Sequence, residues 1–204
     1  MTEPVPSAKS ADTEAGAAGT NRRRKLGGLW QWWLIGAAAA TVFLSLNQLL
    51  NLGFFVGHTL LSNQYLYLVV ALLLPLVFLY WPLTARSPRD RVPWYDLALA
   101  LAALVVSGYF IVNAERIVDE GWEYAAPNTA VVWSALLWAL VLEATRRAGG
   151  LALTVVVVAV SFYPIYTHLV PGPIQGQEAS LAETAIFHAM SSESVLGIPM
   201  QAFA

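Results

Sequence analysis

The feature that most constrains this chain is a long run, residues 26–85, without a single Asp, Glu, Lys or Arg. Further charge-free runs follow at 97–114, 124–142 and 148–177. A helix needs about 20 apolar residues to cross the hydrocarbon of a bilayer. The first run is too long for one crossing, and polar residues divide it near its middle. It therefore predicts two spans, and each later run predicts one.

Together these runs predict an all-α integral membrane protein with about five transmembrane helices. A soluble domain carries about 25% charged residues, whereas this chain has 12% charged and 57% hydrophobic residues. The last span is rich in β-branched residues, but a lone strand in lipid would leave its backbone polar groups unsatisfied, so a helix is favoured. The predicted spans cover about 29–50, 63–82, 94–113, 125–144 and 150–169.

Basic residues are distributed very unevenly between the predicted loops. Cytoplasmic loops of membrane proteins carry an excess of Lys and Arg. With five spans and a cytoplasmic N-terminus, Arg116 alone lies outside, in a loop that also holds the acidic residues Glu115, Asp119, Glu120 and Glu123. We therefore predict a multi-pass protein of a prokaryotic cytoplasmic (inner) membrane. The cytoplasmic basic residues would be Lys9, Arg22, Arg23, Arg24, Lys25, Arg86, Arg89, Arg91, Arg146 and Arg147.

Both ends of the chain carry recognisable signals. Residues 1–28 combine small and polar residues with a basic stretch, which predicts a disordered cytoplasmic tail. The apolar segment after it is too long for a cleaved signal peptide. Ser180 and Glu183 have the spacing of a capping box, which predicts a short helix to about Met190, lying along the outer interface or against other spans. Residues 194–204 resemble the start of another buried segment, so we expect a fragment of a longer chain.

Ionisable residues inside a membrane are candidates for function, and the predicted spans contain almost none. Asp96 lies near Arg91 at the inner start of a span, where the helix dipole favours an acid. Glu143 and Arg147 have the spacing of a helical ion pair. We interpret these residues as structural, and a contact of Glu143 with a partner domain stays open as the alternative.

The sequence offers no catalytic, cofactor-binding or metal-binding residue that we can name. The absence of cysteine excludes disulfides and thiolate metal sites. His58, His168 and His188 are scattered, so we interpret them as solvated or capping residues rather than metal ligands. The chain has no H-E-x-x-H, G-x-S-x-G or P-loop motif. A net charge of −2 without a basic face argues against a nucleic-acid partner. We therefore expect neither an enzyme nor a cofactor.

A few residues predict how the helices pack. Pro75 and Pro164 lie within predicted spans and predict kinks there. Gly53 and Gly57 have the spacing of a close helix contact, although a turn fits them equally well. Trp138 lies deep in the fourth span, so we expect it to face the bundle.

The order of several short motifs resembles the N-terminal region of fused permeases of TRAP (tripartite ATP-independent periplasmic) transporters. The likeness covers roughly residues 60–204, and it depends on the order and spacing of the motifs together. The motifs are 76–82, Pro93-Trp94-Tyr95-Asp96, Gly121-Trp122-Glu123-Tyr124 with Pro127, Leu142-Glu143-Ala144-Thr145-Arg146-Arg147 with Gly149, Tyr163-Pro164, Pro171-Gly172 and 191–199.

The resemblance implies secondary active uptake of organic acids (carboxylates), driven by an ion gradient, usually of sodium. A periplasmic substrate-binding protein would deliver the substrate, and we expect the outer acidic loop to contact it. Residues 29–147 would be a four-helix, small-subunit-like scaffold, and 148–204 the fifth span, the outer helix and the incomplete start of the large transport part. The substrate and sodium sites would lie beyond Ala204 in the remaining transport domain, so the resemblance assigns no site residue to this chain.

Two other interpretations compete with this one. The chain could be a freestanding small membrane subunit, or an assembly or interaction protein, without transport activity of its own. Its odd number of predicted spans and its unfinished C-terminus argue against that interpretation. A membrane-embedded enzyme would need buried ionisable residues, which the predicted spans lack.

Overall fold

The computed structural model describes residues 23–50, 60–84, 86–171, 175–191 and 194. Every regular element within these ranges is helical, which confirms the predicted all-α class. Four of the helices, α2, α3, α4 and α6, are long and apolar enough to cross a membrane. The elements are α2 (Leu29–Leu50), α3 (Ser62–Tyr80), α4 (Trp94–Val112), α5 (Ala114–Asp119), α6 (Asn128–Ser161), α7 (Tyr163–Tyr166), the 3₁₀ helix η1 (Thr167–Leu169) and α8 (Leu181–Met190).

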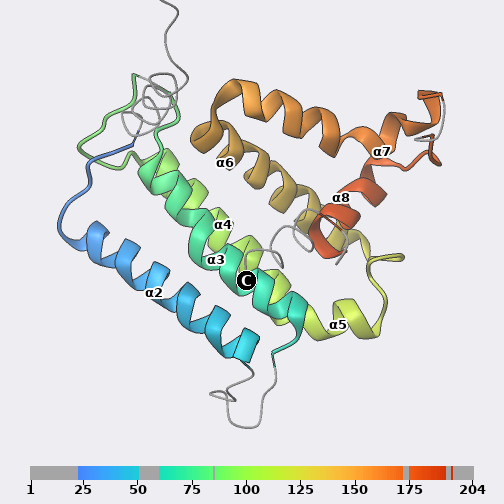
Figure 1. The fold of residues 1–204 in the computed structure, drawn as a ribbon, viewed down its shortest axis with the longest axis horizontal. Coiled ribbons are helices and arrows are strands. Elements are labelled where there is room, and N and C mark those ends of the chain that lie inside the picture. The colour runs from blue at the N-terminus through green and yellow to red at the C-terminus, as the bar shows by residue number, and fades with distance from the viewer. Residues whose placement is uncertain (1–22, 51–59, 85, 172–174, 192–193, 195–204) are drawn as a thin grey trace, which may run out of the picture.

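Helix α3 lies at the centre of the bundle. It packs most extensively against α4, and it also contacts α2 and α6 (Figure 1). The core around it combines large and small side chains: Phe78 and Phe110 are fully buried beside Ala103 and Ala130, which are fully buried too. Small residues let helix backbones approach closely, so the aromatic rings fill the remaining space. α3 continues through Pro75 as one helix.

Helix α6 is bent at Gly150, close to the predicted boundary between the fourth and fifth spans. The backbone of Gly150 has φ 80° and ψ 176°, a conformation that is essentially restricted to glycine. The chain turns at this residue, and a second arm, 151–161, leads away toward α7 (Figure 1, tan to orange). The second arm is about 16 Å long at 1.5 Å per residue, about half of what a bilayer crossing requires.

The fifth predicted span, 150–169, is therefore not a continuous helix. The helix ends at Ser161, and the chain continues through the short elements α7 and η1. Pro164 lies in the first turn of α7, where a proline needs no backbone N–H partner, so it does not kink a span as expected. Residues 53, 57 and 58, for which we predicted a helix contact or turn and a solvated histidine, lie outside the described residues.

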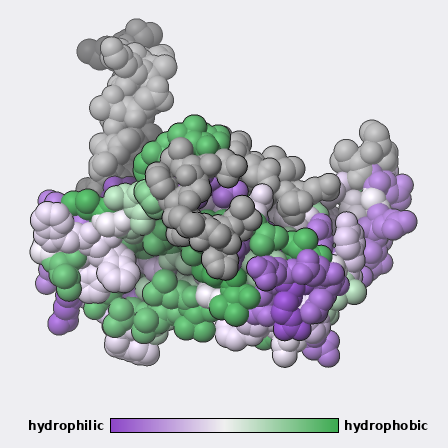
Figure 2. Space-filling model, turned by 90° about the horizontal axis from the view of Figure 1, so that it is seen from below, coloured by the Kyte–Doolittle hydropathy of each residue, from purple (hydrophilic) through white to green (hydrophobic). Residues whose placement is uncertain are grey.

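Much of the surface of the long helices is apolar. Figure 2 shows hydrophobic residues across the middle of one face and hydrophilic residues toward both sides. Large exposed apolar patches mark a surface that contacts a partner or a lipid. The exposed apolar residues on the long helices include Trp32, Ile35, Val42 and Leu49 of α2, Leu97, Leu101 and Val105 of α4, and Val132, Leu136, Leu151, Val155, Val156 and Val160 of α6.

Candidate functional site

An ion cluster lies at the end of the bundle where α2 begins, α3 ends and α4 begins. It consists of Arg24, Asp96, Glu143, Arg146 and Arg147. Asp96 accepts an ion-paired hydrogen bond from Arg24 on one carboxylate oxygen, and Arg147 Nη1 lies 2.6 Å from the other oxygen. The side chains of all three of these residues have no exposed surface.

Glu143 connects the two arginines of α6 within this cluster. Its carboxylate accepts from Arg147 Nε at 2.8 Å, and from Arg146 Nε and Nη2, both at 2.7 Å. The predicted helical ion pair between Glu143 and Arg147 is therefore confirmed. The same carboxylate also holds Arg146 in a two-pronged contact, a geometry that favours arginine over lysine.

The arginines also satisfy the end of α3. The last carbonyls of a helix lack partners within the helix, and cations are favourable there. Arg24 donates from Nη1 to Leu79 O at 2.9 Å and from its backbone N–H to Tyr80 O at 2.8 Å. Arg147 Nη1 lies 3.3 Å from Trp81 O. Asp96 in turn lies in the first turn of α4, at the positive end of that helix.

This arrangement corrects the interpretation of Asp96 from sequence. Asp96 lies at the start of a helix as predicted, but it is completely buried, and its partners are Arg24 and Arg147. The interpretation missed the role of Arg24, because a basic stretch next to a span is normally solvated. Residues 23–28 are part of the packed structure, since Arg23 stacks over the Trp81 ring at 4.6 Å and Arg24 is buried. Residues 23–28 therefore do not belong to a disordered tail, and residues 1–22 lie outside the described part of the chain.

The ion cluster carries one positive charge in excess, because three guanidinium groups face two carboxylates. One nitrogen of the cluster also lacks an acceptor within the described ranges. Nη2 of Arg147 is buried and has no hydrogen-bond partner among the described residues. The Arg147 guanidinium also lies 5.1 Å from the centre of the Phe78 ring, a favourable cation–π distance.

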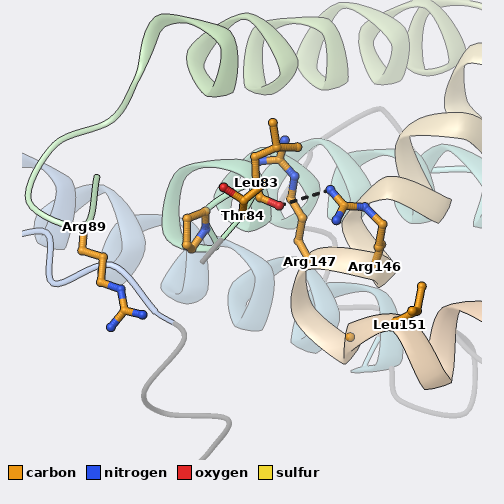
Figure 3. A pocket seen from close by; sticks show the side chains of 8 residues that line it. Leu83, Thr84, Arg89, Arg146, Arg147 and Leu151 are labelled. Carbon is orange, nitrogen blue, oxygen red and sulfur yellow. Dashed lines mark hydrogen bonds between the residues drawn. The ribbon is translucent and has the colours of Figure 1, made fainter. Parts of the chain in front are cut away.

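A cavity of about 390 Å³ adjoins the ion cluster. It lies between the segment that follows α3 and the bend of α6, and Figure 3 shows Arg146 reaching toward that segment. The hydrogen bond drawn there joins Arg146 Nη2 to Leu83 O at 3.4 Å. The residues that line the cavity are Pro82, Leu83, Thr84, Arg89, Arg146, Arg147, Gly150 and Leu151.

The opposite end of the bundle is fastened by α8. The predicted capping box is confirmed: Ser180 Oγ accepts from the backbone N–H of Glu183, and the Glu183 carboxylate accepts from the backbone N–H of Ser180. α8 packs against α6. Tyr67 of α3 donates to Ala189 O at 2.9 Å, and Ser191 donates to Glu123 at 2.6 Å. α8 therefore packs against the other helices, the second of the two placements that we predicted.

His188 ties α8 to the second arm of α6. Its Nε2 lies 2.8 Å from Ser161 O, and because a carbonyl only accepts, Nε2 donates. Ser161 is the last residue of α6, so His188 has the capping role expected for a histidine. Trp138 donates to Ser161 Oγ at 2.6 Å and packs against the His188 ring, as expected for a tryptophan that faces the bundle.

The remaining candidate groups do not converge on a reaction centre. His168 lies 3.9 Å from Glu178 and makes an ion pair only when protonated. Within the described ranges, no group of three or more His, Cys, Asp or Glu residues is placed to hold a metal ion. Comparison of the chain with models of protein families, with curated proteins and with solved structures finds no match.

Proposed function

We propose that this chain is the membrane scaffold portion of a TRAP permease, a secondary active transporter driven by an ion gradient. The observation that carries the proposal is the ion cluster: its buried bonds join α3, α4, α6 and the segment that leads into α2. A scaffold that stays fixed while a transport domain moves needs helices that are held together firmly. The motifs that resemble fused TRAP permeases supply the transporter class.

The distribution of charge supports insertion into a prokaryotic inner membrane. Arg24, Arg89 and Arg146 lie at the end of the bundle where α3 ends, whereas Glu115 and Asp119 lie just beyond the other end of α4. Basic residues favour the cytoplasmic side. The exposed apolar sides of α2, α4 and α6 would then contact lipid, which removes the cost of exposing them to water.

The transport chemistry would belong to the rest of the permease. Organic acid and sodium would bind in the transport domain that follows, and a periplasmic binding protein would deliver the organic acid. On this chain, α5 presents the exposed acids Glu115 and Asp119 at the outer end. These charges would steer the binding protein, since charges at the rim of an interface act mainly on the rate of association.

Sodium-driven uptake tests this proposal. The permease purified from its own membranes is reconstituted with its binding protein, and its intact mass is measured first. We expect a mass well above 22.1 kDa, together with uptake of a labelled organic acid that requires a sodium gradient. A mass of 22.1 kDa without uptake would instead indicate the freestanding subunit or assembly protein.

A charge reversal tests the contact with the binding protein. Glu115→Lys combined with Asp119→Lys should lower uptake about tenfold at limiting binding protein, with a smaller loss at high salt. Asp90→Lys is the matched control, because Asp90 is exposed at the basic end of the bundle. Equal uptake by the double variant and the control would contradict the assignment of this surface.

A further inference from the structure

We propose that the cavity beside the ion cluster binds a phosphate group, presented by the headgroup of an anionic phospholipid. This inference does not depend on transport. It gives a role to Arg89, which has no part in the ion cluster, and to the positive charge that Asp96 and Glu143 leave unbalanced. The cavity holds about 390 Å³ and is lined by Arg89, Arg146 and Arg147. The volume is ample for a tetrahedral phosphate and its glycerol attachment.

The positive charge of the arginines that line the cavity favours binding of an anion. Arg146 and Arg147 share the single carboxylate of Glu143 on this side, and Arg89 is exposed and makes no ion pair with another described residue. Three guanidinium groups of the ion cluster face two carboxylates, and Arg89 adds a further positive charge at the cavity. An anion in the cavity would balance this excess.

The surroundings of the cavity favour a lipid as the source of the phosphate. Gly150 and Leu151 form one rim, and the second arm of α6 begins there. Along this arm Leu151 is 73% exposed and Val155 is 60% exposed. A phosphate held by the arginines would therefore leave acyl chains free to lie along this apolar arm. Basic pockets at the cytoplasmic interface are typical sites for lipid headgroups.

Native mass spectrometry of the purified chain in detergent tests the site. The probes are dioctanoyl phosphatidylglycerol, dioctanoylglycerol, which lacks the phosphate, and inorganic phosphate. We expect one phosphatidylglycerol to bind per chain with higher affinity than dioctanoylglycerol. Arg89→Gln should weaken its binding about fivefold, the equivalent of one basic residue near an anionic lipid. Arg86→Gln is the matched control, because Arg86 is exposed in the same segment but does not line the cavity.

A second variant should act in the opposite direction. Glu143→Gln removes the carboxylate that competes for Arg146 and Arg147, so phosphatidylglycerol binding should tighten severalfold. Loss of folding cannot produce tighter binding, and the unfolding midpoint of each variant is measured alongside.

The possible results distinguish a lipid headgroup from free phosphate, and both of these from unspecific binding. If millimolar inorganic phosphate does not displace the lipid, the site recognises the headgroup together with its chains. If inorganic phosphate binds alone and Arg89→Gln weakens it, the same site takes a free phosphate. Equal weakening by Arg86→Gln and Arg89→Gln, or equal binding of dioctanoylglycerol and phosphatidylglycerol, would overturn the proposal.

Discussion

Both ends of the bundle contain arginine–carboxylate ion pairs, but the pairs are buried at one end and exposed at the other. At the basic end, Asp96 and its partners Arg24 and Arg147 have no exposed side-chain surface. At the acidic end, Arg116 and Glu120 form an ion pair with a 3.0 Å contact, yet their side chains are 60% and 48% exposed. Both contacts are ion pairs by distance. The difference in burial decides which of them holds the fold.

The physical reason is desolvation. A charge buried without its partner cannot recover the hydration that it lost, so removing one member of a buried pair costs several kcal/mol. An exposed pair exchanges its partner for water at little cost. We therefore expect the basic end to be rigid and intolerant of substitution, and the acidic end to be adaptable. This contrast suits a scaffold that is fixed on one side and meets a partner on the other.

The largest effect is expected at Asp96. Asp96→Asn keeps the shape of the side chain but leaves the buried guanidinium of Arg24 without a carboxylate and removes one of the two carboxylates that Arg147 binds. The change should cost about 3–5 kcal/mol of stability. Thermal unfolding in detergent measures the loss. Asp90→Asn, an exposed residue in the segment before α4, is the control and should unfold like the parent. An unchanged midpoint for Asp96→Asn would mean that the buried cluster does not hold the bundle.

Gly150→Ala should have the next largest effect, because a side chain strains the backbone at φ 80° and ψ 176°. The expected cost is about 1–3 kcal/mol, and the bend of α6 that forms one rim of the cavity should loosen. Gly36→Ala, at an exposed position inside α2 with no atom within 4 Å of a new Cβ, should cost nothing. Hydrogen exchange along the second arm of α6 reports the loosening, and protection equal to the parent would contradict it.

A smaller effect is expected at Ser180, which caps α8. Ser180→Ala removes the acceptor for the backbone N–H of Glu183 and should cost about 1 kcal/mol. Ser180→Thr retains a capping oxygen and should keep most of the stability. Limited proteolysis near α8 reports the fraying of its first turn. Equal cleavage of both variants would argue that packing against α6 alone holds α8.

The smallest effect is expected at the acidic end. Hydrogen bonds from Trp122 and from Arg116 lower the pKa of Glu120. A carboxylate with a lowered pKa stabilises the folded state above its unfolded-state pKa, and this stabilisation is lost as the pH falls through the folded-state pKa. Arg116→Gln should barely change unfolding at neutral pH and should reduce the acid dependence slightly. A large loss at neutral pH would erase the contrast between the two ends.

The sequence predicts part of this structure well because the signals involved are local. The charge-free runs predicted α2, α3 and α4 nearly to the residue, and the spacing of Ser180 and Glu183 predicted the capped start of α8. The i, i+4 spacing of Glu143 and Arg147 likewise predicted their ion pair. Each of these features depends on neighbours within one or two turns of a helix.

The remainder depends on contacts between distant segments. Arg24 and Asp96 are separated by 72 positions, and no local pattern distinguishes Arg24 from the basic residues beside it. The charges predict a boundary near Gly150, but they do not show that the arm after it ends at Ser161 instead of crossing the membrane. The cavity follows from the bend at Gly150 and from the segment after α3, so it could be found only in three dimensions.

Cysteine labelling across the membrane tests the central claim most directly. The chain contains no cysteine, so Arg86→Cys and Asp119→Cys each introduce one thiol, at the basic and the acidic end. In spheroplasts, a membrane-impermeant maleimide should label Asp119→Cys at once and Arg86→Cys only after the membrane is permeabilised. Labelling of Arg86→Cys in intact spheroplasts, with Asp119→Cys protected, would contradict a scaffold whose locked end faces the cytoplasm.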